Sequence, residues 1–221
     1  MIRPAILVQA LGGAALIAGH VLTTKVLRRW RTSWGATTAE AETAMPGDEL
    51  IPHSRWGYTH AVTVDATPEQ VWPWIAQLGQ GRGGFYSYQG LENLIGCRVH
   101  NTDTILPDYQ KLGVGDGVRL HPKAPPLTVA MVEPNSRLVL RGANPDTGDA
   151  SIWAFHLLRV DDRHTRLIER GRGNYGPTVS SRLTFGPLLL EPIGFVMSRK
   201  MLLTIRDLAG GPTHATRPRS W

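Results

Sequence analysis

Cysteine is nearly absent from this chain, which carries Cys97 alone among 221 residues. A single cysteine excludes an intrachain disulfide and a zinc site built from several thiolates. The eight histidines show no H-x-x-H, H-x-x-x-H or H-E-x-x-H spacing, and the sequence has no G-x-S-x-G and no P-loop. Such local patterns commonly mark metal, acyl-transfer and nucleotide sites. We therefore expect no bound metal and no cofactor.

Acidic residues are missing from the first 31 positions, although the formal net charge of the whole chain is +6. The excess of basic residues lies at the two ends, and the region between them holds more acidic than basic residues. A nucleic-acid-binding domain is usually basic where it is folded, so we expect no nucleic-acid partner. Basic ends fit a membrane surface better. The basic residues of the first end are Arg3, Lys25, Arg28, Arg29 and Arg31.

Residues 4–22 form a stretch without a charged side chain, PAILVQALGGAALIAGHVL. A helix of this length rises about 28 Å, close to the thickness of a bilayer's hydrocarbon core. We expect a single-pass anchor in the cell membrane. A cleaved signal peptide, a helix lying in the membrane interface and an apolar helix packed on the domain are the alternatives. If the segment spans, the basic residues after it place the following domain in the cytoplasm.

Residues 32–57 are small and acidic, and Pro46-Gly47 interrupts them. This composition predicts a linker with little regular structure, apart from a helical turn near residues 37–43. The chain is thus expected to have four parts. These are an anchor or apolar helix with a basic flank (1–31), a linker (32–57), a folded domain (58–209) and a disordered tail (210–221).

Periodicity within the folded domain predicts a strand, two helices, several strands and a last helix. Residues 58–64 alternate as a strand does, and Thr67 and Gln70 form a capping box for a helix that ends at Gly79. A short second helix is expected over residues 88–95. Turn-forming residues separate the expected strands 117–121, 127–133, 137–142, 152–160 and 165–173. The last helix is expected over residues 193–208.

Residues 79–109 combine glycines, aromatic residues and polar side chains. The run from Gly79 to Gly84 matches G-x-G-x-x-G in spelling, but a helix precedes it and an aromatic loop follows. The dinucleotide fingerprint needs a strand before it and a helix directly after it. We therefore interpret the glycines as a sharp turn between the two helices. A loop of this kind on a rigid scaffold is a common place for binding groups.

The order of elements predicts an α+β fold in which a curved antiparallel sheet wraps around a long C-terminal helix, preceded by an N-terminal apolar helix. This helix-grip order resembles the SRPBCC or START-like superfamily, which includes Bet v 1-like proteins and polyketide cyclases. The resemblance covers residues 45–208 and is closest to an actinobacterial-type branch. It implies an apolar cavity between sheet and helix, without implying one activity. The matching segments are MPGDELIP, THAVTVDATPEQVWPWIAQLGQGRGGFYSYQGLENLIG, HNTDTI, VGDGVRL and FVMSRKMLLTI.

Aromatic and sulfur-containing side chains are the apolar candidates for ligand contacts. Tyr86 and Tyr88 can line a pocket mouth or pack in the core. Trp153 and Phe155 alternate with other residues and are expected to face the core or cavity. Met197 and Met201 lie one helical turn apart on the last helix, where methionine suits a cavity of variable content.

Polar candidates lie in the loop and on the last strand. Glu92 and His100 are the candidates for an acid–base pair, the alternative being a hydrogen-bonded network with Asn101 that fixes the loop. Arg170 enters the cavity if its side of the strand faces inward and is exposed to solvent if it faces outward. Glu169 has the opposite parity and shares its face with Leu167.

Three functions remain open from the sequence. The first is a membrane-tethered module that binds a hydrophobic small molecule or lipid between the sheet and the C-terminal helix. The second is a cyclase-, dehydratase- or hydrolase-like enzyme acting on an apolar substrate. The third is a structural protein whose cavity is filled by its own side chains.

Overall fold

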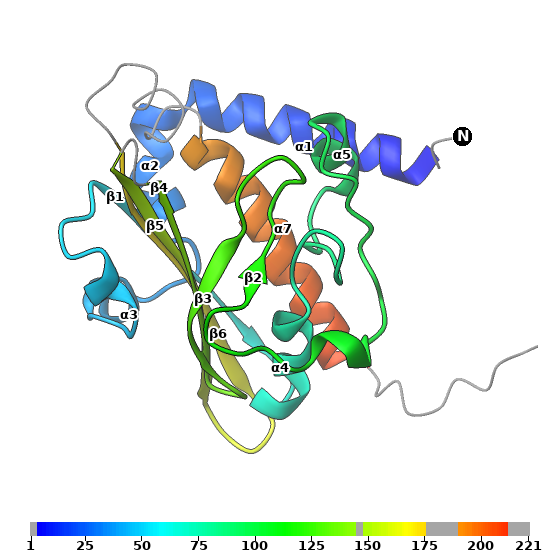
Figure 1. Ribbon diagram of the computed structural model, residues 1–221. Helices are drawn as coiled ribbons and strands as arrows, with labels where there is room; N and C mark the ends of the chain where they lie inside the picture. Colours follow the sequence, from blue (N-terminus) through cyan, green and yellow to red (C-terminus); the bar gives the residue numbers. More distant parts are fainter. Residues whose placement is uncertain (1–3, 145–147, 176–189, 212–221) are drawn as a thin grey trace, which may run out of the picture.

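The computed structural model describes residues 4–144, 148–175 and 190–211. A six-stranded antiparallel sheet, in the order β1-β6-β5-β4-β3-β2, curves around the long helix α7 (Leu190–Gly210) (Figure 1). This is the expected α+β helix-grip architecture. The strands are β1 (Trp56–Val64), β2 (Gly117–Val118), β3 (Leu127–Glu133), β4 (Arg137–Asn144), β5 (Asp149–Arg159) and β6 (Thr165–Asn174). The other helices are α1 (Pro4–Leu22), α2 (Thr24–Thr32), α3 (Thr38–Glu42), α4 (Pro68–Ala76), α5 (Gln89–Leu94) and the 3-10 turns η1 (Asp48–Leu50) and η2 (Pro107–Tyr109).

The capping box predicted for the first domain helix is present. The Thr67 amide donates to the Gln70 side chain at 2.9 Å, and Pro68 occupies the first helical turn, where a missing N–H costs nothing. The strands 127–133 and 165–173 are found within one residue of their predicted bounds. The last helix begins three residues earlier and ends two residues later than predicted.

Successive residues of β6 point to opposite faces of the sheet, as a pleated strand requires. Glu169 accepts a hydrogen bond from Ser198 of α7, whereas Arg170 pairs with Asp48 of η1. We call the face that carries Glu169 and meets α7 the inner face, and the opposite one the outer face. β1 pairs with β6, so the first strand lies beside the last and both contribute to each face.

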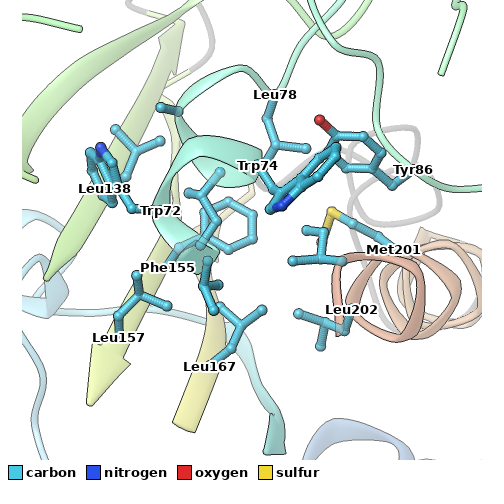
Figure 2. Packing of buried hydrophobic residues seen from close by; sticks show 14 of the residues in the cluster. Trp72, Trp74, Leu78, Tyr86, Leu138, Phe155, Leu157, Leu167, Met201 and Leu202 are labelled. Carbon is cyan, nitrogen blue, oxygen red and sulfur yellow. The ribbon is translucent and has the colours of Figure 1, made fainter. Parts of the chain in front are cut away.

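The main core lies between the inner face, α4 and the C-terminal half of α7. Met201, Leu202 and Ile205 are at most 2% exposed and pack with Phe155 and other buried apolar residues. In Figure 2 the Met201 sulfur points toward the rings of Trp74 and Tyr86. Side chains therefore fill the space between this half of α7 and the sheet, where the sequence resemblance implied a cavity.

The segment expected to be a linker carries α3 and η1, and residues 37–51 pack on the outer face. Thr37 and Glu40 form a capping box for α3. Ile51 is 3% exposed and belongs to a second apolar cluster with Val139 and Ile152. The helical turn expected near residues 37–43 is present as α3, and η1 is the other regular element between residues 33 and 55. The segment nevertheless packs on the sheet, because its carboxylates and apolar side chains match groups there. Of the tail predicted to be disordered, residues 212–221 lie outside the described part of the chain.

α1 runs across one end of the domain beside α5 and the start of α7 (Figure 1). Within the described residues it is the one helix long and apolar enough to cross a membrane. α2 follows it and is fixed to α7 by the Arg31 guanidinium, which is fully buried and lies 2.5 Å from Glu191 Oε1. Arg28 lies 3.0 Å from the other carboxylate oxygen of Glu191.

Candidate functional site

A fully buried carboxylate, Glu169, is the centre of a polar cluster on the inner face. Its Oε1 accepts hydrogen bonds from Trp153 Nε1 at 2.7 Å, Ser198 Oγ at 2.8 Å and Tyr58 OH at 3.1 Å. The donors come from β5, α7 and β1, so the cluster joins the sheet to the helix. All three donors are neutral, so none of them supplies a formal counter-charge to the carboxylate.

His60 lies beside the other carboxylate oxygen of Glu169. His60 Nδ1 lies 3.4 Å from Glu169 Oε2, and Nε2 lies 3.0 Å from the backbone carbonyl oxygen of Arg31. Both ring nitrogens thus face acceptors, whereas a neutral imidazole has one N–H. Satisfying both contacts requires an imidazolium or a protonated Glu169. The imidazole and the carboxylate therefore lie side by side, as groups that act together in acid–base chemistry must.

Glycines on β6 allow the aromatic residues of β1 to lie against the sheet. A Cβ at Gly171 would be 2.2 Å from the Tyr58 ring, and a Cβ at Gly173 would be 2.5 Å from the Trp56 ring. The Tyr58 ring stacks on His60 with 4.5 Å between centroids. Burial and the Glu169 carboxylate raise the pKa of Tyr58 well above its ordinary value, so the phenol stays a donor.

Glu92 on α5 is a second buried carboxyl group beside α7. It is 6% exposed, and its Oε2 has no hydrogen-bond partner among the described residues. Burial raises its pKa to about 7, and a hydrogen bond from Ser87 opposes this only in part. The Ser87 hydroxyl also lies 3.5 Å from the sulfur of Met197, the residue before Ser198. Glu169 thus bonds Ser198 of α7 directly, whereas Glu92 is linked to the neighbouring Met197 only through Ser87.

Partly exposed apolar side chains remain near this turn. Trp153 is half-buried, and its ring lies 4.9 Å from Phe155 and 6.5 Å from Phe85 between centroids. Met197 is also half-buried. A groove of about 320 Å³ lies outside, between α2, α3 and β1, and Tyr58 is the residue it shares with the Glu169 cluster. The residues that line this groove do not include any residue of α7.

The two tyrosines predicted to line a pocket have different surroundings. Tyr86 is 1% exposed, adopts a left-handed backbone with φ 56°, and its hydroxyl accepts from Gln77 Nε2 at 2.8 Å. Tyr88 begins α5 and lies against Gly13 of α1, since a Cβ there would be 2.9 Å from its ring. Of the remaining apolar candidates, Phe155 and Met201 belong to the filled core.

His100 is exposed, in contrast to the buried Glu92. The neighbouring Asn101 has the structural role that the sequence left open. Its Oδ1 accepts from the amides of Phe85 and Tyr86 at 2.9 Å each, and its Nδ2 donates to the Ser87 carbonyl. The polar loop thus fixes the position of the residues that lead into α5.

Arg170 takes the outward of the two orientations considered from parity, but it is not exposed to solvent. It is 1% exposed, and its guanidinium makes two hydrogen bonds to Asp48, at 2.9 Å and 2.7 Å. It also donates to Thr59 Oγ1 and to backbone carbonyls of the segment 37–51. The predicted ligand contact of Arg170 is therefore replaced by an ion pair on the other face of the sheet.

Sequence reasoning did not select Glu169, Tyr58, His60 or Ser198 as site residues. The alternation in β1 and β6 did contain a signal, because Glu169 shares its face with Leu167 and Tyr58 with His60. A glutamate with inward parity between apolar residues is a buried carboxylate that must find donors. No group of three or more possible metal ligands occurs among the described residues.

No family model matches the chain, and no curated protein matches it. Solved structures with related folds include norcoclaurine synthase from Thalictrum flavum, with 15% identity, coverage of 71% of this chain and 94% of the other, and a TM-score of 0.41. A hypothetical protein from Helicobacter pylori has 12% identity, 79% and 99% coverage and a TM-score of 0.42. The Aha1 dimer from Colwellia psychrerythraea has 14% identity, 70% and 96% coverage and a TM-score of 0.39. These likenesses are too distant to indicate a family, an activity, a ligand or a partner.

Proposed function

We propose that this chain is a membrane-tethered, SRPBCC-like module that binds an apolar molecule carrying a hydrogen-bond-donating head group. The observation that carries the proposal is a pair of buried carboxyl groups. Glu169 bonds Ser198 of α7, and Glu92 lies beside Ser87, which contacts the neighbouring Met197. No arginine or lysine side chain bonds either group among the described residues. A hydroxyl or amine head group can supply the missing donor to Glu92, and apolar atoms can lie against Trp153 and Met197.

The proposed binding region is displaced from the one expected from sequence. Met201 and Phe155 are packed in the filled core, so a ligand has to enter near the N-terminal half of α7. Of the sequence candidates, the proposal retains Trp153, Met197 and Glu92 and adds Glu169. The hydrophobic small molecule or lipid remains the proposed partner.

An enzymatic function is the second candidate, and one observation favours it. His60 and Glu169 are placed to share a proton beside the Tyr58 hydroxyl, which suits general acid–base chemistry on an apolar substrate. A cyclase, dehydratase or hydrolase would use such a group. Binding of a substrate near Trp153 is common to both candidates, so binding is tested first.

The membrane part of the proposal rests on α1 and the basic residues after it. α1 is 19 residues long and has no charged side chain. Arg28 and Arg29 follow in α2, so we propose that the domain lies on the cytoplasmic side of the cell membrane.

Calorimetric titration with decanol, decylamine and decanoate tests the binding proposal. We expect saturable one-to-one binding of the alcohol and the amine, and at least about tenfold weaker binding of decanoate, since its carboxylate would meet Glu92. Glu92→Gln should reduce the preference for the amine. Glu133→Gln, at a carboxylate that is 58% exposed, is the matched control and should leave binding unchanged.

Two methionine variants separate a binding module from a filled structural protein. Met197→Trp should weaken binding with little loss of stability, because Met197 is half-buried beside Ser87. Met201→Trp should lower the free energy of unfolding by ~1–3 kcal/mol, because it overpacks the closed core. If none of the three ligands binds and both variants are equally destabilising, the structural alternative holds and the binding proposal fails.

A further inference from the structure

α1 has two apolar sides, and the domain covers only one of them. Gly13, the one buried residue of α1, lies where a Cβ would be 2.9 Å from side-chain atoms of Leu91 and Tyr88. A Cβ at Gly90 would likewise be 2.9 Å from Ala10. These small residues let α1 and α5 approach closely, as in helix pairs that pack through glycine. The middle of α1 is therefore held against the domain.

The other side of α1 is exposed and carries no charged residue. Leu7, Leu11 and Leu22 are 52%, 64% and 87% exposed, and helical spacing places them on the side opposite Gly13. Val8 on the same side is 69% exposed. Soluble surfaces rarely leave such a continuous apolar face uncovered. We call these four residues the outer side of α1.

The neighbouring helices extend this apolar surface. Val26 and Trp30 of α2 are 82% and 50% exposed. Leu94 ends α5 one turn after Gly90, on the side of α5 that meets α1, and is 82% exposed. Ile95 beside it is 71% exposed. Exposed large apolar residues thus gather on three helices at the same end of the domain (Figure 1).

We infer that α1 lies in the plane of the membrane, with its outer side and Leu94 in one leaflet and the domain packed on its other side. This inference rests on the membrane association in the proposed function and replaces its spanning form. The chain has no acidic residue before Glu40, and Arg29 is exposed beside Trp30. An apolar face bordered by basic residues is complementary to an acidic bilayer surface.

Two alternatives for what covers the outer side of α1 fit the observations less well, namely a bilayer that α1 spans and a second copy of the chain. If α1 spanned the bilayer with its present packing, α5 with Glu92 and Asn93 would lie at the depth of the hydrocarbon, where such side chains are costly. A second copy of the chain related by a two-fold axis would bring the basic residues of α2 against the same residues of its partner. A bilayer avoids both problems.

Vesicle flotation of the full chain tests the lipid face. The protein should float with vesicles of phosphatidylcholine and phosphatidylglycerol (3:1) and bind more weakly to phosphatidylcholine alone. Leu11→Glu should reduce the bound fraction at least about tenfold, because it places a carboxylate in the apolar face. Val160→Glu is the control, since Val160 is 59% exposed in the turn between β5 and β6, far from α1 (Figure 1). Thermal melts of both variants should match the parent.

Cysteine labelling distinguishes the in-plane from the spanning arrangement. In a Cys97→Ala background, Gln9→Cys and Ala5→Cys are each treated with a membrane-impermeant maleimide after binding to sealed vesicles. Both positions are exposed, and helical spacing places them away from the outer side. In the plane, both should react from outside without detergent. In a spanning helix, position 9 is shielded by hydrocarbon, and position 5 reacts only after the vesicles are opened.

Each outcome separates this inference from the rest of the proposal. Labelling of position 5 only after opening overturns the in-plane arrangement and leaves a membrane tether. Absence of flotation for a folded protein overturns both forms of membrane association but leaves the ligand titrations untouched. A dimer in solution that Leu11→Glu converts to a monomer, again without flotation, assigns the face to a second copy and overturns the inference.

Discussion

On the outer face of the sheet, arginines meet carboxylates, whereas Glu169 on the inner face and Glu92 on α5 are buried beside neutral groups. Arg170 and Arg172 both bond Asp48, and Arg166 bonds Glu40 at 2.7 Å. On the inner face, Glu169 accepts from neutral groups. Glu92 on α5 keeps one oxygen without a hydrogen-bond partner among the described residues. Charges on the outer face are matched within the chain, so they stabilise it. The inner face leaves acceptor capacity that a ligand can use.

The pKa directions follow the same division. On the outer face, burial alone would raise the pKa of Asp48, but hydrogen bonds from Arg170, the Met45 amide and Arg172 lower it overall. On α5, burial raises the pKa of Glu92 to about 7. Asp48 therefore stabilises the folded protein at pH values above the pKa that this carboxyl group has in the unfolded chain. This stabilisation is lost as the pH falls through its lower pKa in the folded protein. Glu92 has the opposite effect. The free energy of unfolding falls as the pH rises from the pKa of Glu92 in the unfolded chain to its higher pKa in the folded protein.

The largest expected effect comes from breaking the ion pair on the outer face. Arg170→Met should lower the free energy of unfolding by about 3–5 kcal/mol, because it leaves the Asp48 carboxylate in a mostly buried site. Arg172 pairs with the same carboxylate but is 27% exposed, so Arg172→Met should cost no more than about 1 kcal/mol. Urea unfolding at neutral pH measures both. Equal small losses would mean that the segment 37–51 is held by apolar packing alone.

The next effect tests the inner face through its pH dependence. Glu92→Gln should stabilise the protein at pH 8 by up to about 3 kcal/mol, since the gap between a pKa of 4.5 unfolded and about 7 folded corresponds to that energy. At pH 4 the variant and the parent should unfold at similar urea concentrations, because the parent carboxyl is then protonated in both states. Parallel curves at every pH would show that Glu92 is ionised freely in the folded protein.

The contrast between the faces explains how much the sequence could predict. Local signals found α4, the strands of the hairpins and α7, because capping, alternation and turn residues act over a few positions. The direction of Arg170 and Glu169 depends on which side of β6 receives α7 and which receives residues 37–51. That choice is made by packing between segments more than a hundred residues apart, as the Arg170–Asp48 pair shows.

The composition of the connecting segment concealed its role. Residues 32–57 are polar and interrupted by proline and glycine, which is typical of a linker. Their carboxylates at positions 40 and 48 are nonetheless the partners of the β6 arginines. A buried arginine on a strand and an acidic segment outside it could have been paired by charge alone. The free oxygen of Glu92 could not have been found this way, since it depends on the exact burial of α5 under α7 and α1.

The smallest of the three effects concerns the outer face in acid. His156 lies there, opposite Arg137 in the β4–β5 pairing, and is 5% exposed. Burial, with the charges of Arg137 and Arg170, lowers its pKa from 6.5 to about 4. Between pH 6.5 and 4, His156 is protonated in the unfolded chain but stays neutral in the folded chain. The free energy of unfolding therefore falls as the pH drops from 6.5 toward 4.

At pH 5 this histidine should cost the parent roughly 2 kcal/mol relative to pH 8. His156→Leu has a similar volume and replaces a ring whose Nε2 has no partner among the described residues, so it should remove about this much of the acid loss. His53→Leu changes an exposed histidine and should leave the loss intact. The measurement is urea unfolding of the three proteins at both pH values. An acid loss that survives His156→Leu unchanged would assign it to the carboxylates of the arginine pairs, and the outer face would then respond to acid through its ion pairs alone.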